Sequence, residues 1–150
     1  MKPLYVLLIA FGLAVLGIKI FLHQYDFALS ARIAMSVMLL FTAIGHFAFP
    51  TGMVMMIPDF IPFKLTMVYL TGVIEISVAI GLQVPGVSVL TGWMLILFFI
   101  MILPANINAA IKHIDYQKGT TDGNGLNYLW FRVPLQLLFI VWTYLSSVKF

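Results

Sequence analysis

Five long apolar segments, separated by short connections, organise the chain. They cover about residues 4–22, 31–49, 65–82, 87–111 and 128–148. Each is close to the roughly 20 residues that an α-helix needs to cross the hydrocarbon core of a bilayer. Their apolar residues lack the strict alternation of transmembrane β-strands, which also form shorter segments. The pattern predicts an all-α membrane protein in which residues 1–150 form a single transmembrane domain.

The composition supports this class and excludes several others. Only 9% of the residues are charged and 63% are hydrophobic, whereas soluble domains average about 25% charged residues. The net charge is +3, and no basic run interleaved with aromatic residues points to a nucleic-acid partner. Because the chain has no cysteine, it forms no disulfide, thiolate metal site or Cys-x-x-Cys redox motif. The partner that the composition predicts is the lipid bilayer.

The first apolar segment and the distribution of basic residues bear on topology. Lys2 ahead of an apolar run and the stretch "ALSA" resemble a secretory signal, but Lys19 follows the run and favours a retained helix. One side of the five spans carries Lys2, Lys64, Lys112 and Lys118, and the other carries Lys19, Arg32 and Lys149. The positive-inside rule then predicts a cytoplasmic N-terminus. We expect a multi-pass protein of a bacterial inner or plasma membrane.

The connection "FPTGMVMMIPDFIPF", residues 49–63, is unusually apolar for a loop. Its three prolines, Pro50, Pro58 and Pro62, interrupt a continuous helix. Its methionines and phenylalanines are atypical of a solvated loop. Two interpretations stay open: a plain re-entry of the chain through the membrane interface, or a lid over a pocket.

Polar residues inside the apolar segments are the candidate functional residues. Six of them, from four segments, lie between the bilayer midplane and the side of the 49–63 connection: His46, Glu75, Asn106, Asn108, Arg132 and Gln136. At a rise of 1.5 Å per residue, Glu75 lies about 15 Å into its segment and Gln136 about 12 Å. Each such group costs free energy in hydrocarbon unless it is paired. We therefore expect them to face one another in a polar cavity that opens toward this side.

Glu75 has two candidate partners, Arg132 from the same side and Arg32 from the opposite side. One interpretation is a buried Glu–Arg pair with a structural role. The other uses the second guanidinium to bind an anionic or carbonyl-bearing ligand. Haem is disfavoured because His46 and His113 do not form a convincing axial pair, and the spacing of His and Asp residues predicts no metal site.

Four stretches in order, "ARIAMSVMLLFTAIGHF", "TGVIEISVAIGL", "LPANINAAI" and "FRVPLQLLF", resemble the DoxX-like membrane protein family. The resemblance covers about residues 31–148 and implies a four-helix transmembrane bundle, to which this chain adds one N-terminal transmembrane helix. It implies functional positions at Arg32, Glu75, Asn106, Arg132 and Gln136. Members have been associated with redox complexes, as small subunits linked to quinone reduction or to thiol and sulfur oxidation. Without cysteine, this chain cannot itself exchange thiols.

Two functions therefore remain open. The first is a small membrane subunit that binds a lipophilic or quinone-like ligand, alongside a partner redox subunit or as a homo-oligomer. Its candidate ligand-binding residues are His46, Glu75, Asn106, Arg132, Gln136 and Arg32. The second is a non-catalytic scaffold or assembly partner whose polar cluster is structural and whose docking surface includes Gly12 and Gly17. No catalytic residue is assigned, and whether the chain is an enzyme is left open. Transport has less support because no internal repeat is visible.

Overall fold

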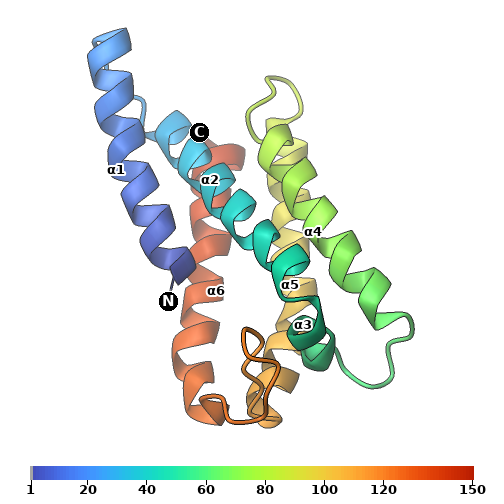
Figure 1. The fold of residues 1–150 in the computed structure, drawn as a ribbon. Helices are drawn as coiled ribbons and strands as arrows, with labels where there is room; N and C mark the ends of the chain where they lie inside the picture. Colours follow the sequence, from blue (N-terminus) through green and yellow to red (C-terminus); the bar gives the residue numbers. More distant parts are fainter. Residues whose placement is uncertain (1) are drawn as a thin grey trace.

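The computed structural model describes residues 2–150, which fold into a bundle of long helices (Figure 1). The helices are α1 Lys2–Leu22, α2 Phe27–Ala48, α4 Lys64–Gly81, α5 Ser88–Ile111 and α6 Leu129–Thr143, with the short α3 Pro50–Met56 between α2 and α4. A 3-10 turn, Gly125–Tyr128, precedes α6, and a π-helical end, Tyr144–Lys149, follows it. Five spans are long and apolar enough to cross a membrane, the fifth being the composite Gly125–Lys149. The helices confirm the predicted all-α class, and the five candidate spans agree with a multi-pass membrane protein.

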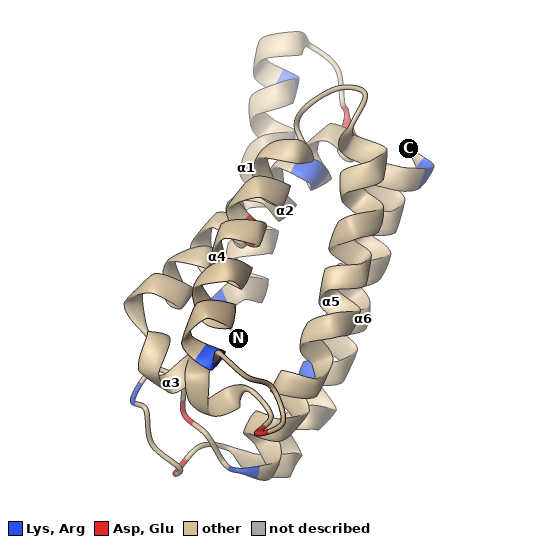
Figure 2. Cartoon of the chain, turned by 90° about the vertical axis from the view of Figure 1, so that its right-hand side faces the viewer, with Lys and Arg blue, Asp and Glu red and all other residues tan. Residues whose placement is uncertain are grey.

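The long helices pack as two groups, with α1, α2 and α4 in one and α5 and α6 in the other. Helix α2 lies along α4, and α5 lies along α6 and its π-helical end, while α1 packs on α2. Figure 2 shows the α2–α4 pair and the α5–α6 pair on opposite sides of the bundle. Helix α1 is displaced along the bundle, so that its last turns extend past the end at which the C-terminus lies (Figure 1).

Apolar side chains fill the space between the helices. The largest fully buried ones include Leu7 from α1, Met35 and Leu39 from α2, and Leu95 from α5. Trp142 ties three helices together at one end of the bundle: its Nε1 donates to the Ala31 carbonyl at 3.0 Å, and its ring meets the Phe11 ring edge-on at 5.1 Å. These contacts fix the position of α1 against α2 and α6.

The 49–63 connection forms the short helix α3 and an irregular segment that follows it. Pro50 begins α3, where its missing N–H costs no hydrogen bond. Gly52 is buried against the 112–124 loop so closely that an added Cβ would overlap the Tyr116 carbonyl. Asn108 Nδ2 donates to the Met56 carbonyl at 2.8 Å, which satisfies an acceptor at the end of α3. The connection therefore folds onto the end of α5 rather than projecting away from it.

An ion cluster holds the irregular segment in place. The Asp59 carboxylate lies 2.9 Å from Lys64 Nζ and 2.8 Å from Lys112 Nζ. Hydrogen bonds from the Lys112 and Lys64 ammonium groups, together with their positive charge, lower the pKa of Asp59 from 3.8 to about 2. One carboxylate thus links the first residue of α4 to the residue that follows α5.

This pKa shift predicts a pH-dependent stability. Because the folded state binds its proton less tightly than the unfolded state, the contribution of Asp59 is complete above about pH 4 and is lost as the pH falls toward 2. Melting temperatures of the wild type and Asp59→Asn should therefore differ at about pH 6 and converge toward pH 2. Lys112 contributes most to the lowered pKa of Asp59. In Lys112→Gln, the pKa of Asp59 should therefore lie closer to its ordinary value. A constant difference between wild type and Asp59→Asn across this interval would contradict the assignment.

Candidate functional site

Glu75 faces α2 across a close helix–helix contact. Gly72, one turn before Glu75 on the same face of α4, lets the two helices approach, because an added Cβ there would lie 2.8 Å from His46 Cβ. Glu75 itself is only 6% exposed. The carboxyl group is therefore enclosed between α2 and α4 and needs partners there.

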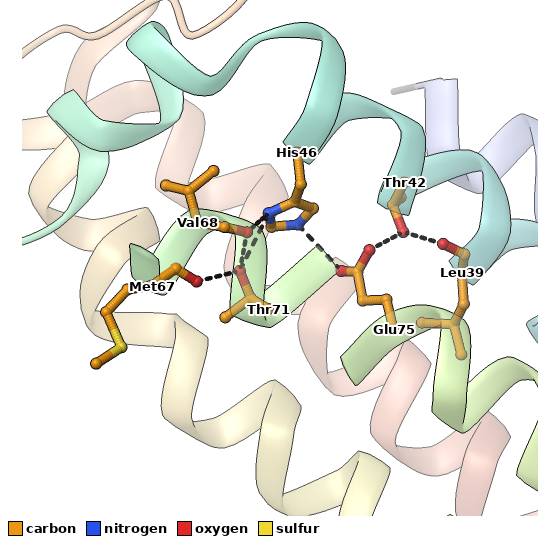
Figure 3. Close-up of polar contacts among 7 residues, drawn as sticks. All are labelled: Leu39, Thr42, His46, Met67, Val68, Thr71 and Glu75. Atoms are coloured by element: carbon orange, nitrogen blue, oxygen red, sulfur yellow. Dashed lines mark hydrogen bonds and ion pairs between the residues drawn. The ribbon is translucent and has the colours of Figure 1, made fainter. Parts of the chain in front are cut away.

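Two side chains of α2 supply those partners (Figure 3). Thr42 Oγ1 lies 2.9 Å from Glu75 Oε2, and His46 Nε2 lies 3.5 Å from Glu75 Oε1. The other ring nitrogen, His46 Nδ1, lies 3.0 Å from the Val68 carbonyl, which can only accept. Nδ1 thus faces the Val68 carbonyl and, at 3.1 Å, the Thr71 hydroxyl, while Nε2 faces the Glu75 carboxyl group.

Thr42 holds the carboxyl group from the other side. Its hydroxyl lies 2.9 Å from Glu75 Oε2 and 3.0 Å from the Leu39 carbonyl, so it can donate to either oxygen. The Glu75 carboxyl group therefore has a polar partner from α2 at each of its oxygens.

The expected pairing of Glu75 with arginine is wrong. Within residues 2–150, His46 is the one basic side chain within ion-pair distance of Glu75. Arg32 lies ten residues before Thr42 on α2, or about 15 Å along the helix axis, which is too far for a contact. Arg132 belongs to α6, which pairs with α5. Counting residues gave the depth of each side chain but not the neighbouring helix that it meets.

A second polar group lies on the α5–α6 pair. Gln136 Nε2 donates to the Phe99 carbonyl of α5 at 2.6 Å. Pro104 lies in the same part of α5, where it removes one backbone donor and loosens the adjacent turn. Asn106 is 7% exposed, and its Nδ2 is buried with no hydrogen-bond partner among residues 2–150. Asn108 is committed elsewhere, to α3.

The predicted site residues thus fall into separate sets. The structure brings His46 and Glu75 together on α2 and α4, and it places Asn106 and Gln136 on α5 and α6. No hydrogen bond or ion pair joins the two sets in the described part of the chain. Arg32 joins neither set and has a buried Nε that lacks a partner among residues 2–150.

The threonine hydroxyls beside Glu75 and His46 went unnoticed in the sequence. Thr42 and Thr71 contact the His46–Glu75 pair, and each lies one helical turn before a member of it. Ser36 donates to the Ala79 carbonyl at 2.7 Å and accepts from Gln83 at 2.7 Å, further along the same helix pair. The signal that could have found the threonines is their spacing, Thr42 to His46 and Thr71 to Glu75, four residues apart on one face.

Two hollows lie away from these groups. One of about 670 Å³ lies where the α1–α2 turn meets the C-terminal end, with Tyr25, Phe27 and Trp142 in its wall. The other, of about 320 Å³, lies beside Asp59 at the end of α5. None of the six predicted ligand-binding residues lines either hollow.

Residues 35–147 match the model of a protein family described as "Domain of unknown function (DUF8561)". The matched region contains His46, Glu75, Asn106, Arg132 and Gln136, whereas Arg32 and α1 lie outside it. No curated protein and no solved structure matches the chain.

Proposed function

Because this chain belongs to the DUF8561 family, for which no function is known, we propose its function from its own residues: it is a small membrane subunit that binds a lipophilic, carbonyl-bearing ligand such as a quinone. The observation that carries the proposal is the buried Asn106 Nδ2, which lacks a partner among residues 2–150. A buried donor without an acceptor costs about 1–3 kcal/mol. A ligand carbonyl at Asn106 would remove that cost and would be recognised by its oxygen.

Two further features support a ligand of this kind. Pro104 and Pro134, one in each helix of the α5–α6 pair, interrupt the backbone hydrogen bonds of these helices, and we propose that the helices part there to admit a flat ring. The His46–Glu75 pair across the bundle brings together two groups of kinds that can exchange a proton. The same proposal takes the protein to resemble DoxX-like subunits. It places the protein in a bacterial inner membrane, beside a partner redox subunit. The proposal concerns binding, because reduction of the ligand would need an electron donor on a partner.

The test is labelling with a photoreactive azidoquinone in native-lipid nanodiscs, combined with native mass spectrometry. We expect wild-type protein to be labelled on α5 or α6 and Asn106→Leu to lose about tenfold in labelling, as expected for one lost hydrogen bond of about 1.4 kcal/mol. Ser77→Ala is the matched control, since Ser77 bonds only its own helix at the exposed face of α4. Helix content must stay unchanged in both variants, and neither may melt at a lower temperature than the wild type.

Two results would overturn the proposal. Equal labelling of the wild type and Asn106→Leu would show that Asn106 does not hold the ligand. Labelling confined to the hollow around Tyr25 and Trp142 would move the ligand to the other end of the bundle.

A scaffold is the second candidate, and one observation favours it. The Glu75 carboxyl has both of its oxygens occupied by Thr42 and His46, so this cluster already has a sufficient structural role in holding α2 to α4. Gly12 and Gly17 of α1 also have open space around them, as an unoccupied docking face requires. In that case the azidoquinone would label no position specifically, and native mass spectrometry would show an oligomer or a second protein instead.

A further inference from the structure

The hollow beside Asp59 combines excess positive charge with a position at the end of the bundle. Lys64 begins α4 and Lys112 follows α5, and both line the hollow together with Thr121. Val54 and Met55 of α3 add apolar wall. The hollow measures about 320 Å³, enough for a group larger than a water molecule. Positive side chains, a hydroxyl donor and apolar wall are the features expected of a site for an amphipathic anion.

The charges in this hollow are not balanced. Two ammonium groups share one carboxylate, and the side chain of Asp59 is 78% exposed whereas those of Lys64 and Lys112 are 25% and 39% exposed. Each ammonium has three donors, so it keeps its contact with Asp59 and still has donors to offer. The N-terminus of α4 adds to the positive potential, because no side chain caps it. One further negative charge would neutralise the cluster.

The residues around this hollow favour a position at the surface of the membrane. Phe60 follows Asp59 and Phe63 precedes Lys64, two residues that line the hollow. The two phenylalanines are 83% and 78% exposed. The backbone of Phe63 has a φ of 53°, an uncommon conformation for a non-glycine residue. Exposed phenylalanine rings beside the start of a membrane-length helix are expected to contact lipid at the membrane interface. Lipid phosphates lie at that level, within reach of lysines beside the helix ends.

We infer that Lys64, Lys112 and Thr121 bind the phosphate of an anionic phospholipid headgroup, with Phe60 and Phe63 inserted among the neighbouring lipids. The phosphodiester accepts from both ammonium groups and from the Thr121 hydroxyl, beside the Asp59 carboxylate. Its single negative charge completes the neutralisation of the cluster. This site lies outside the proposed quinone pocket and does not depend on it.

Native mass spectrometry from mixed micelles of phosphatidylglycerol and phosphatidylcholine tests this inference. We expect wild-type protein to retain phosphatidylglycerol in preference to phosphatidylcholine. The double variant Lys64→Gln/Lys112→Gln should retain at least tenfold less phosphatidylglycerol. The matched control is Lys19→Gln/Lys149→Gln, which changes the net charge equally at the other end of the bundle. Thr121→Val keeps every charge and should weaken retention by a smaller factor, which preserves the test if the double variant fails to fold.

The alternatives give distinct results. Equal retention by wild type and Lys64→Gln/Lys112→Gln would overturn the inference. So would an equal loss in the control, because net charge alone would then explain retention. Competition by inorganic phosphate at millimolar concentration, with no preference between the two lipids, would assign the site to a free anion and overturn the headgroup assignment.

Discussion

Replacement of Gly72 by leucine is expected to force α2 away from α4 and to lower the free energy of unfolding by about 1–3 kcal/mol or more. An added Cβ at Gly72 lies 2.8 Å from His46 Cβ and 3.1 Å from the Phe47 ring. Because His46 Cβ is fixed to its backbone, it cannot rotate away, and the helices themselves must move. That movement also lengthens the His46–Glu75 contact, which is already 3.5 Å.

Gly12→Leu is the matched control for this variant. Both glycines lie within helices, so leucine gains about 0.8–1 kcal/mol of helix propensity at either position. Gly12 has no atom within 4 Å of an added Cβ, so only the propensity gain remains there. Denaturant titration in detergent, followed by tryptophan fluorescence, measures both. If Gly72→Leu proved as stable as Gly12→Leu, the close approach of α2 and α4 would be wrong.

Glu75→Leu should destabilise the protein by about 2 kcal/mol, and Glu75→Gln by less than about 1 kcal/mol. Leucine removes the acceptor for Thr42 and the partner of His46 Nε2 and leaves both groups in an apolar interface. Glutamine keeps a carbonyl oxygen for Thr42 and an amide donor for the imidazole nitrogen. The ordering of the two variants therefore reports whether the cluster is bonded as described.

A combined variant separates the cost of unpaired groups from the loss of the carboxyl itself. Glu75→Leu with Thr42→Val and His46→Leu leaves no polar group without a partner, and it should recover most of the stability lost in Glu75→Leu. The measurement is the same denaturant titration on all four proteins. If the triple variant were less stable than Glu75→Leu, the polar cluster would contribute net stability beyond the pairing of its own members.

The membrane-spanning helices were predictable because the length and apolarity of a segment are properties of the sequence itself and do not depend on its neighbours in the fold. Predicted segments 65–82 and 87–111 correspond to α4 Lys64–Gly81 and α5 Ser88–Ile111, with ends that differ by one residue at most. The α1–α2 turn is shorter than expected, since α2 begins at Phe27 rather than near residue 31. Asp26 explains the earlier start: its carboxylate accepts from the Leu29 N–H and caps the helix.

The partners of the polar residues were less predictable. Depth placed Glu75 and Gln136 inside the bilayer, but depth alone does not decide which helix a given face meets. Arginine is a candidate partner for Glu75 because its charge is opposite and its side chain is long, whereas the partners in the structure, Thr42 and His46, come from the helix that lies along α4. Threonine is ordinary in transmembrane helices, so its role became visible only once the pairing of α2 with α4 was known.

The pairing of α2 with α4 also has a consequence for how the protein is made. The residues that satisfy the polar face of α2 come much later in the chain: Glu75 lies 33 positions after Thr42, and Ala79 lies 43 after Ser36. At about 5–20 residues per second, the ribosome needs seconds to supply them. During that interval a histidine and two hydroxyl groups of α2 have no partner on α4, and we expect α2 to stay beside the insertion channel until α4 arrives. The order of synthesis, and not only the final fold, therefore constrains which polar residues α2 can carry.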